Sequence, residues 1–228
     1  LGWDEIRTKI VTSMVANTAP ASATEVDWSW VGQFGAAGWY QPLNDGIAKD
    51  VLADVPTASI FSYDGNVLGV TYNNDFRVMI YNKNHLTDAG VEAVPTTPDE
   101  LLAAARAVKE KGVAEHPIGL PLSATEGTST AWYLLTKAFG GDLFDENFEP
   151  LFTDPESAGY KAMEFEISAL EEGLIDPAAT GLKDVEIQEL FKSGKITFDV
   201  AGWAGNLSVY TDAEKSQVAD GAAAALMI

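Results

Sequence analysis

Hydrophobic and polar positions follow one another along this chain of 228 residues in blocks with either helical or strand-like spacing. The segment Thr97-Pro98-Asp99-Glu100 is a capping box with proline at the first helical position, and Gly112 ends the apolar stripe that follows. Similar patterns predict four more helices, over 4–16, over 130–139, from 154 to 173 and from 184 to 194. The helix that begins at Asp154-Pro155-Glu156 runs through four apolar residues, Ala162, Met163, Ile167 and Leu170, to Gly173.

Short β-type runs separate these helices, at residues 67–71, 77–81, 118–120, 195–200 and 222–228. Strands that alternate with helices predict an α/β layered fold. The triplet Asp64-Gly65-Asn66 has the composition of a tight hairpin turn. The polar segment 72–76 lies between two strand-like runs, so we expect the chain to pass there from one lobe to another.

Charge narrows the range of partners. The chain has 34 acidic and 14 basic residues, which gives a formal net charge of −20. Such a protein repels phosphate backbones and anionic membranes, so we expect no nucleic-acid partner. The hydrophobic fraction of 46% is ordinary for a globular protein with a packed core.

The sequence lacks most of the short motifs that mark catalytic and metal-binding sites. The chain has no cysteine, and it has no phosphate-binding loop, dinucleotide fingerprint, nucleophile elbow or H-E-x-x-H motif. Asp145, Asn147, Glu149 and Glu156 fall at EF-hand positions, but Pro150 stands where that loop requires glycine, which favours a hairpin before a helix. We therefore expect no cofactor and no metal site. Paired carboxylates for glycoside hydrolysis stay open, because abundant acids can supply a pair anywhere.

Tryptophan is the most informative residue type, with six copies. Sugar rings present a flat C–H face surrounded by hydroxyls, so their sites combine aromatic platforms with planar polar groups. Asp27-Trp28-Ser29-Trp30 has this mixture, and Asn73-Asn74-Asp75-Phe76-Arg77 supplies polar partners. We expect Trp3 and Trp39 to belong to the core. The pattern alone leaves three tryptophans open between a core position and a site position: Trp28, Trp30 and Trp203.

Five motifs in a fixed order resemble those of the extracellular solute-binding proteins, the maltose-binding-protein-like receptors of ABC sugar importers. They are EVDWSWVGQFGAAG at 25–38 followed by Pro42-Leu43, DGNVLGVTYNNDFRVMIYNK at 64–83, PTTPDEL at 95–101, Gly140-Gly141, and ELFKSGKITFDVAGW at 189–203. Each motif alone is loose, but the five together cover nearly the whole chain in the correct order.

The resemblance implies a two-lobed α/β fold of the periplasmic-binding-protein type that closes over its ligand by hinge bending. Residues 1–74 would form part of the first lobe and residues 75–228 the second, with one hinge near 72–77 and another near 228. The implied ligand-binding residues are Asp27, Trp28 and Trp30 on the first lobe, Asn74, Asp75 and Arg77 at the hinge, and Glu126, Trp132 and Trp203 on the second lobe. Trp203 would be the main stacking platform.

The resemblance also implies a function. The protein would be a non-catalytic, monomeric receptor in the periplasm or, with a lipid anchor, at the cell surface, and it would deliver a mono- or oligosaccharide to an ABC transporter membrane permease. Two other functions stay open from the residues: a glycoside hydrolase with paired carboxylates, and a binding protein for a non-sugar solute such as a polyamine. The family's opening strand and helix and its C-terminal segment have no counterpart in these residues, so we expect the fold to lack them.

Overall fold

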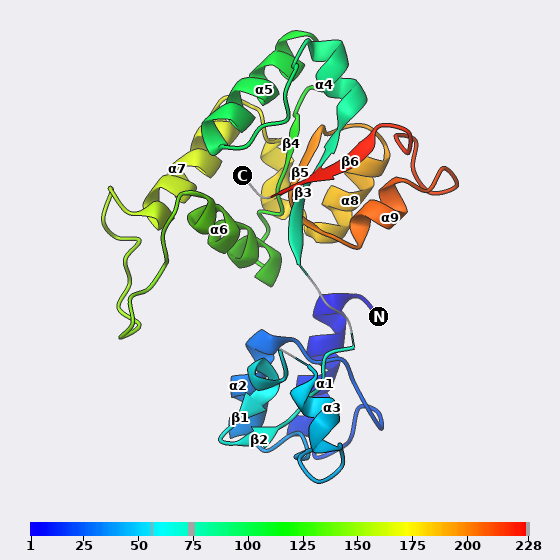
Figure 1. Ribbon diagram of the computed structural model, residues 1–228, viewed down its shortest axis with the longest axis vertical. Coiled ribbons are helices and arrows are strands. Elements are labelled where there is room, and N and C mark those ends of the chain that lie inside the picture. Colours follow the sequence, from blue (N-terminus) through cyan, green and yellow to red (C-terminus); the bar gives the residue numbers. More distant parts are fainter. Residues whose placement is uncertain (56, 73–75, 227–228) are drawn as a thin grey trace. The chain divides into compact units, whose positions relative to one another are not determined.

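The computed structural model describes residues 1–55, 57–72 and 76–226, and the chain divides into two compact units, Leu1–Asn74 and Asp75–Ile228 (Figure 1). Each hydrophobic cluster of the described residues lies within one of these units. The units are therefore described separately, as unit 1 and unit 2.

Unit 1 is mostly helical. Its elements are α1 (Trp3–Val15), the 3-10 turn η1 (Trp28–Trp30), α2 (Val31–Ala36), α3 (Lys49–Ala53), the 3-10 turn η2 (Ala58–Phe61), β1 (Ser62–Tyr63) and β2 (Asn66–Val67). The hydrophobic stripe that predicted a helix over 4–16 is confirmed by α1, in which Ile10 is buried against Trp30 and Phe34. Trp39 packs against this cluster as predicted, but Trp3 does not join the core, because its side chain is 42% exposed.

The predicted hairpin turn is confirmed in unit 1. Strands β1 and β2 pair antiparallel, and the two residues between them, Asp64 and Gly65, have φ of 49° and 76°. Positive φ at both central residues is the signature of the turn that suits the right-handed twist of a hairpin. The prediction of a strand over 67–71 is wrong beyond Val67, where β2 ends, and Leu68 donates its N–H to the carbonyl of Phe61, the last residue of η2.

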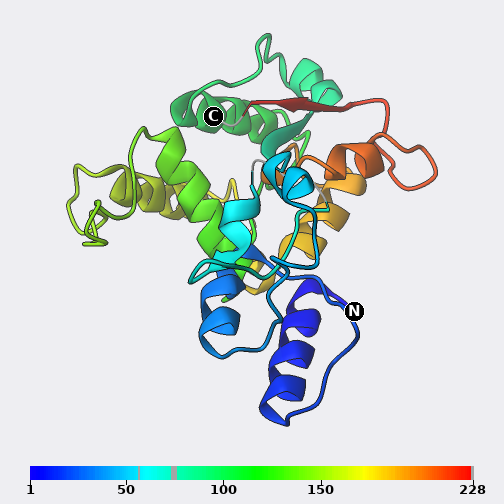
Figure 2. The same ribbon diagram turned by 60° about the horizontal axis from the view of Figure 1, so that its bottom comes forward.

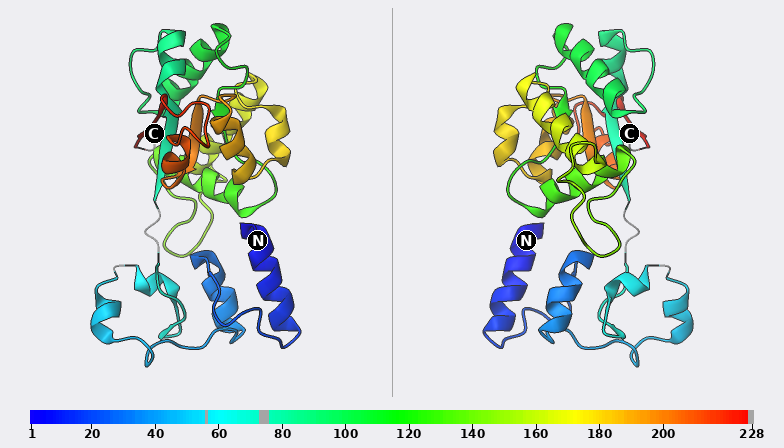
Figure 3. Two further views of the ribbon diagram at one scale, coloured as in Figure 1. Left: turned by 90° about the vertical axis from the view of Figure 1, so that its right-hand side faces the viewer. Right: turned by 90° about the vertical axis from the view of Figure 1, so that its left-hand side faces the viewer.

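Unit 2 is built around a four-stranded sheet with the order β4-β5-β3-β6. Its elements are β3 (Arg77–Asn82), α4 (Lys83–Ala89), α5 (Pro98–Glu110), β4 (Ile118–Gly119), α6 (Glu126–Ala138), α7 (Ala158–Glu171), the 3-10 helix η3 (Pro177–Gly181), α8 (Asp184–Lys192), β5 (Phe198–Trp203), α9 (Asn206–Tyr210) and β6 (Ala222–Ala225). Strand β3 runs antiparallel to β5 and β6, whereas β4 and β5 are parallel. Figures 2 and 3 show the strands and helices of this unit from other sides.

Both faces of this sheet are covered. Met79 on β3 belongs to a cluster with residues of α4, α5, α6 and α7, whereas Val78 and Ile80 belong to a second cluster with residues of α8 and α9. Successive side chains of a strand point to opposite faces, so the two clusters lie on the two faces of the sheet. The predicted α/β layering is therefore confirmed.

Helix boundaries were predicted well where local capping decides them. Thr97 caps α5 by accepting the N–H of Glu100 at 3.2 Å, and the carboxylate of Glu100 accepts the N–H of Thr96 at 2.8 Å. Helix α8 begins at Asp184 as predicted. Two starts were wrong: α6 begins at Glu126 rather than near 130, and α7 begins at Ala158.

The predicted start of α7 at Asp154 is instead a tight turn. The Asp154 carboxylate accepts the N–H of Glu156 at 2.9 Å, and Ser157 then caps α7 by accepting the N–H of Tyr160 at 3.2 Å. Aspartate is a residue type that often caps helices, but the carboxylate of Asp154 closes a turn here. Ser157, three residues later, occupies the capping position of α7.

Only some of the apolar residues of α7 face the core. Ala162, Phe165 and Ala169 are buried in the first cluster and Leu170 packs against it, whereas Met163 and Ile167 are 38% and 48% exposed. The apolar spacing predicted the helix, and the fold decided which of its apolar residues are buried.

Candidate ligand-binding site

One edge of the sheet in unit 2 brings several polar and aromatic groups together. Arg77 begins β3 and Trp203 ends β5, and the two residues are register partners. Because β4 and β5 are parallel and β3 is antiparallel to β5, the carboxyl ends of β4 and β5 lie at the same edge as the amino end of β3. Ligands of open α/β sheets bind outside the carboxyl ends of the strands, so this edge is the candidate site.

Arg77 is held in place at this edge. Its guanidinium donates through Nη1 to the carbonyl of Ala201 at 3.2 Å, and the same nitrogen lies 3.9 Å from the Asp184 carboxylate. A guanidinium presents its N–H donors in a planar fork, a geometry that suits the binding of oxygen atoms. The predicted site residues Arg77 and Trp203 are therefore brought together by the sheet.

Asp184 was missed as a site residue. It is the first residue of α8, and a Cβ on Gly127 would lie 2.2 Å from its Oδ2, so the carboxylate rests against the first turn of α6. Carboxylates are stabilised at helix N-termini by the partial positive charge of unpaired N–H groups. Its sequence signal, an acid at a predicted helix start, was interpreted only as a helix-start residue, and the pairing with Arg77 needs the tertiary fold.

Glu126 begins α6, whose first turn contacts Asp184. One of its carboxylate oxygens lies 3.3 Å from the Thr130 hydroxyl, which donates to it. Glu126 therefore lies at the same edge of the sheet as Arg77 and Trp203. Its position in the first turn of α6 is one where the helix dipole stabilises a carboxylate.

Trp203 offers a partly open aromatic face. Its side chain is 38% exposed, and its ring lies against Gly205, where a Cβ would come within 2.6 Å of ring atoms. The close approach is possible only because residue 205 has no side chain. The indole therefore has one face against the protein backbone and exposed surface that an apolar ligand face can contact.

A buried carboxylate lies beneath this edge. Asp199 in β5 is 4% exposed, and it accepts hydrogen bonds from Tyr210 Oη at 2.9 Å and from Asn206 Nδ2 at 3.4 Å. Burial raises the pKa of Asp199 to about 6, and it also raises the pKa of Tyr210.

Trp132 has packing contacts within unit 2. Its Nε1 donates to the carbonyl of Gly159 at 2.8 Å, and its ring meets the edge of Phe152 at a centroid distance of 5.0 Å. Both contacts join α6 to the segment around the start of α7. The indole thus serves helix packing, and its contact with a ligand stays a prediction.

In unit 1 the predicted site residues separate. Trp30 is buried, with ring centroids of Trp3 and Phe34 at 5.0 and 5.9 Å, so its ring belongs to the core of unit 1, and its contact with a ligand stays a prediction. Trp28, two residues earlier, is 63% exposed. Asp27 caps the 3-10 turn between them by accepting the N–H of Ser29 at 2.8 Å. The other two predicted residues, Asn74 and Asp75, lie outside the described residues.

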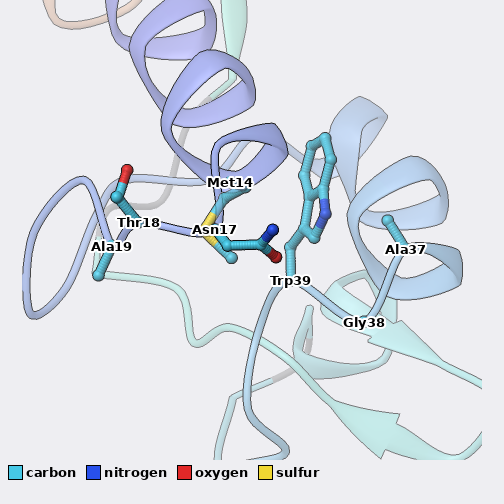
Figure 4. A pocket seen from close by; sticks show the side chains of 7 residues that line it. All are labelled: Met14, Asn17, Thr18, Ala19, Ala37, Gly38 and Trp39. Atoms are coloured by element: carbon cyan, nitrogen blue, oxygen red, sulfur yellow. The ribbon is translucent and has the colours of Figure 1, made fainter.

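Unit 1 also has an open cavity of about 370 Å³ at the C-terminal ends of α1 and α2 (Figure 4). The indole of Trp39 forms one wall, and Met14 and Asn17 face it from the end of α1. None of the predicted ligand-binding residues lines this cavity.

The described part of the chain has neither a metal-binding cluster nor a helix that could cross a membrane. Within those residues, no group of three or more acidic or histidine side chains is arranged to hold a metal ion. In the same ranges, none of the helices combines the length and the apolar character that crossing a lipid bilayer requires. At the sequence that resembles an EF-hand, the Asp145 carboxylate instead accepts the N–H groups of Asn147 and Glu149 at 2.8 and 2.9 Å.

The chain is similar in sequence to proteins of a known family. A family model described as bacterial extracellular solute-binding protein matches residues 1–227. The chain is 27% identical over 197 residues to a binding protein of Brucella abortus, a match that covers 85% of this chain and 47% of that protein. It is 26% identical over 232 residues to the mannitol-binding protein of Pseudomonas aeruginosa, covering 96% of this chain and 52% of that one. The chain thus spans about half the length of these curated relatives.

A solved structure supports the fold. The solute-binding protein of an ABC transporter from Agrobacterium radiobacter, in complex with ribitol, matches with a TM-score of 0.84 at 20% identity, and the match covers 100% of this chain and 58% of that chain. At this identity the match shows a shared fold. It confirms the predicted fold class, which was drawn from the alternation of strands and helices and from the order of the motifs.

Proposed function

This chain belongs to the bacterial extracellular solute-binding protein family, and from that membership we propose that it forms part of a carbohydrate receptor of an ABC importer. The receptor binds a sugar or a polyol and delivers it to the membrane permease of the importer, without catalysing a reaction. Relatives described with mannitol and with ribitol support this ligand class. The family description supports a location outside the cytoplasmic membrane, where a free or a lipid-anchored receptor can meet its permease.

The observation that carries this proposal is the pair formed by Trp203 and Arg77 at the sheet edge of unit 2. A partly exposed indole offers an apolar face to the C–H side of a sugar or polyol. The guanidinium beside it, oriented by Ala201 and Asp184, donates to hydroxyl oxygens. The two groups together match the two chemical faces of a carbohydrate.

Acceptors complete the proposed site in unit 2. Asp184 and Glu126 are carboxylates at the starts of α8 and α6, and each can accept hydrogen bonds from ligand hydroxyls. In unit 1 we propose Trp28, with Asp27 ordering its turn, as a further ligand contact, because its ring is exposed. Asn74 and Asp75 stay predictions.

The domain assignment is also a proposal. We assign residues 1–74 to a first lobe and residues 75–228 to a second lobe, with hinges near 72–77 and near 228. The division of the chain into two compact units at the same position supports this assignment. We further propose a monomer, since a net charge of −20 opposes association of two copies.

Binding measurements test the function directly. We expect D-mannitol, ribitol or maltose to bind at one molecule per chain in calorimetry and to raise the melting temperature, because a ligand that binds only the folded state stabilises it. Spermidine serves as the cationic comparison, and reducing-end release from maltooligosaccharides reports hydrolysis. Binding of spermidine with no response to any sugar or polyol would overturn the ligand class, and turnover of the oligosaccharides would overturn the non-catalytic assignment.

A further inference from the structure

Asp199 is a charged residue in a position that a hydrophobic residue would ordinarily occupy. It lies in β5 on the face of the sheet that packs against α8 and α9, where Ile80, Phe191 and Tyr210 are fully buried. Its two hydrogen-bond donors, Tyr210 and Asn206, are neutral and belong to α9. Burial of a carboxylate costs stability, and an apolar side chain in its place is often neutral or stabilising. Stability is therefore a poor reason for an acid at this position.

The backbone around Asp199 is shaped to admit its carboxylate. Between the pairs Val78–Gly202 and Ile80–Asp199, β5 has one residue more than β3, and this bulge puts Gly202 on the same side as Asp199. A Cβ on Gly202 would lie 2.8 Å from Asp199 Oδ2. Glycine at 202 thus leaves the space through which the carboxylate reaches α9.

The two partners of Asp199 fix both ends of α9. Asn206 is the first residue of the helix and Tyr210 the last, and both are buried. The Tyr210 ring also stacks on Phe191 of α8 at a centroid distance of 4.3 Å. Helix α9 is short, so its position depends on these few contacts rather than on a broad packed face.

Trp203 is joined to α9 by only two residues, Ala204 and Gly205. Its backbone is paired with Arg77 on one side of this link, and Asn206 is tied to Asp199 on the other. The Trp203 ring lies against Gly205, so a movement of α9 carries the surface on which the ring rests. The orientation of the indole is thereby coupled to the hydrogen bonds of Asp199.

We propose that Asp199 is a positioning residue, which holds α9 against β5 through Tyr210 and Asn206 and so fixes the Trp203 ring for ligand binding. The inference rests on the proposed function for its consequence in binding, but the effect on the indole exists without a ligand. Two charged groups face Asp199, Arg77 from β3 and Asp184 from α8. The neutral but titratable Tyr210 from α9 faces it as well. Protonation of Asp199 removes the charge that Tyr210 and Asn206 bind, so the indole should respond to pH.

The test follows the indole N–H resonance of Trp203 by NMR in the ligand-free chain, assigned by its loss in Trp203→Phe. We expect this resonance to shift with pH around a midpoint of about 6 in the wild type, and to lose that response in Asp199→Asn. Tyr210→Phe removes one hydrogen bond with a minimal change of shape, and we expect it to move the resonance at all pH values. Glu166→Gln changes the other acid that is buried among the described residues of unit 2 and is the matched control, with an unchanged Trp203 resonance.

Affinity for D-mannitol, ribitol or maltose gives the second readout. We expect Asp199→Ala to weaken binding of the responding ligand about tenfold, and Asp199→Asn, which keeps an oxygen acceptor for Tyr210, to recover most of that loss. If Asp199→Ala does not fold, Tyr210→Phe tests the same link and should weaken binding severalfold. A Trp203 resonance that neither Asp199→Asn nor Tyr210→Phe alters would overturn the positioning role, whatever the melting temperatures. Failure of the wild type to bind any of the three ligands would contradict the proposed function instead, while the resonance still decides the role of Asp199.

Discussion

Unit 1 and unit 2 hold their exposed tryptophans in different ways. Trp28 of unit 1 belongs to a three-residue 3-10 turn whose order depends on the Asp27 cap and on the burial of Trp30 next to it. Trp203 of unit 2 ends a six-residue strand that is paired with β3. A strand in a sheet is fixed by a ladder of backbone hydrogen bonds, whereas a short turn is fixed by one cap and by side-chain packing.

The cores differ in the same sense. The buried cluster of unit 1 consists of Ile10, Trp30 and Phe34, with partly buried neighbours around it. Unit 2 has clusters on both faces of its sheet. A few large side chains therefore carry the packing in unit 1, while unit 2 distributes it over many.

Trp30→Ala should remove the centre of the unit 1 core. We expect the free energy of unfolding of unit 1 to fall by about 3–5 kcal/mol, the usual cost of truncating a buried aromatic residue to alanine. Hydrogen exchange with mass spectrometry should show loss of protection in α1 and α2, with β3 and β5 unchanged, because the cluster contains residues of unit 1 only. Trp28→Ala is the control, since its ring is 63% exposed and its loss should cost less than about 0.5 kcal/mol. Equal effects of the two substitutions would contradict the contrast.

Glu166 tests the core of unit 2 through pH. Burial raises its pKa to about 7, and one carboxylate oxygen has no hydrogen-bond partner within the described protein. The folded state then binds the proton more tightly than the unfolded chain, whose Glu pKa is about 4.3. The stabilising contribution is complete below about pH 4.3 and is lost as pH rises through about 7, a change of roughly 3–4 kcal/mol.

Urea unfolding of wild type and Glu166→Gln over this pH range measures that contribution. Asp199, whose pKa is raised to about 6, gives a slope of the same sign in both proteins, so the difference between them isolates Glu166. We expect the variant to gain on the wild type as pH rises from 4.5 to 7.5. A constant difference between the two proteins would show that Glu166 titrates normally.

Trp203→Ala compares the two units in binding. We expect it to weaken the affinity for the responding sugar or polyol by roughly 1–3 kcal/mol, the scale of a lost aromatic contact, with the melting temperature of the free chain little changed. Calorimetry measures the affinity, and Trp28→Ala run in parallel shows how much unit 1 contributes. Trp132→Phe alters a ring that packs between α6 and α7, and we expect it to weaken the affinity less than Trp203→Ala. Affinity of Trp203→Ala within twofold of the wild type would remove Trp203 from the site.

Gly65→Ala should give the smallest effect. Residue 65 has φ of 76°, and an alanine in this left-handed region costs about 1 kcal/mol. Amide exchange of β1 and β2 should accelerate, while Gly65→Asn, which tolerates positive φ better, should change it less. Identical exchange in the alanine variant and the wild type would show that the hairpin contributes little to unit 1.

Helix caps and turns were predictable from the sequence where residues close together in the chain decide them. The Thr97 cap, the turn at Asp64-Gly65 and the start of α8 at Asp184 all depend on residues within a few positions of one another. The start of α7 was not, because Asp154 and Ser157 are both good caps and the local pattern does not choose between them.

The site was predictable only in part. Motif order indicated Arg77, Trp203 and Glu126, and the sheet brings their elements to one edge. It also indicated Trp30 and Trp132, whose rings the fold uses for packing. Asp184 went unnoticed as a site residue, since its partner Arg77 lies more than a hundred residues away.

By itself, then, the sequence determined the family, the alternation of strands and helices, and the caps and turns, because these follow from residue order and short-range contacts. Tertiary structure alone decided which tryptophans are exposed, which face of α7 is buried, and that Asp199 reaches α9 beneath Gly202. These features depend on contacts between segments distant in sequence, and a pattern of apolar and polar residues specifies the face of an element without specifying what will lie against it.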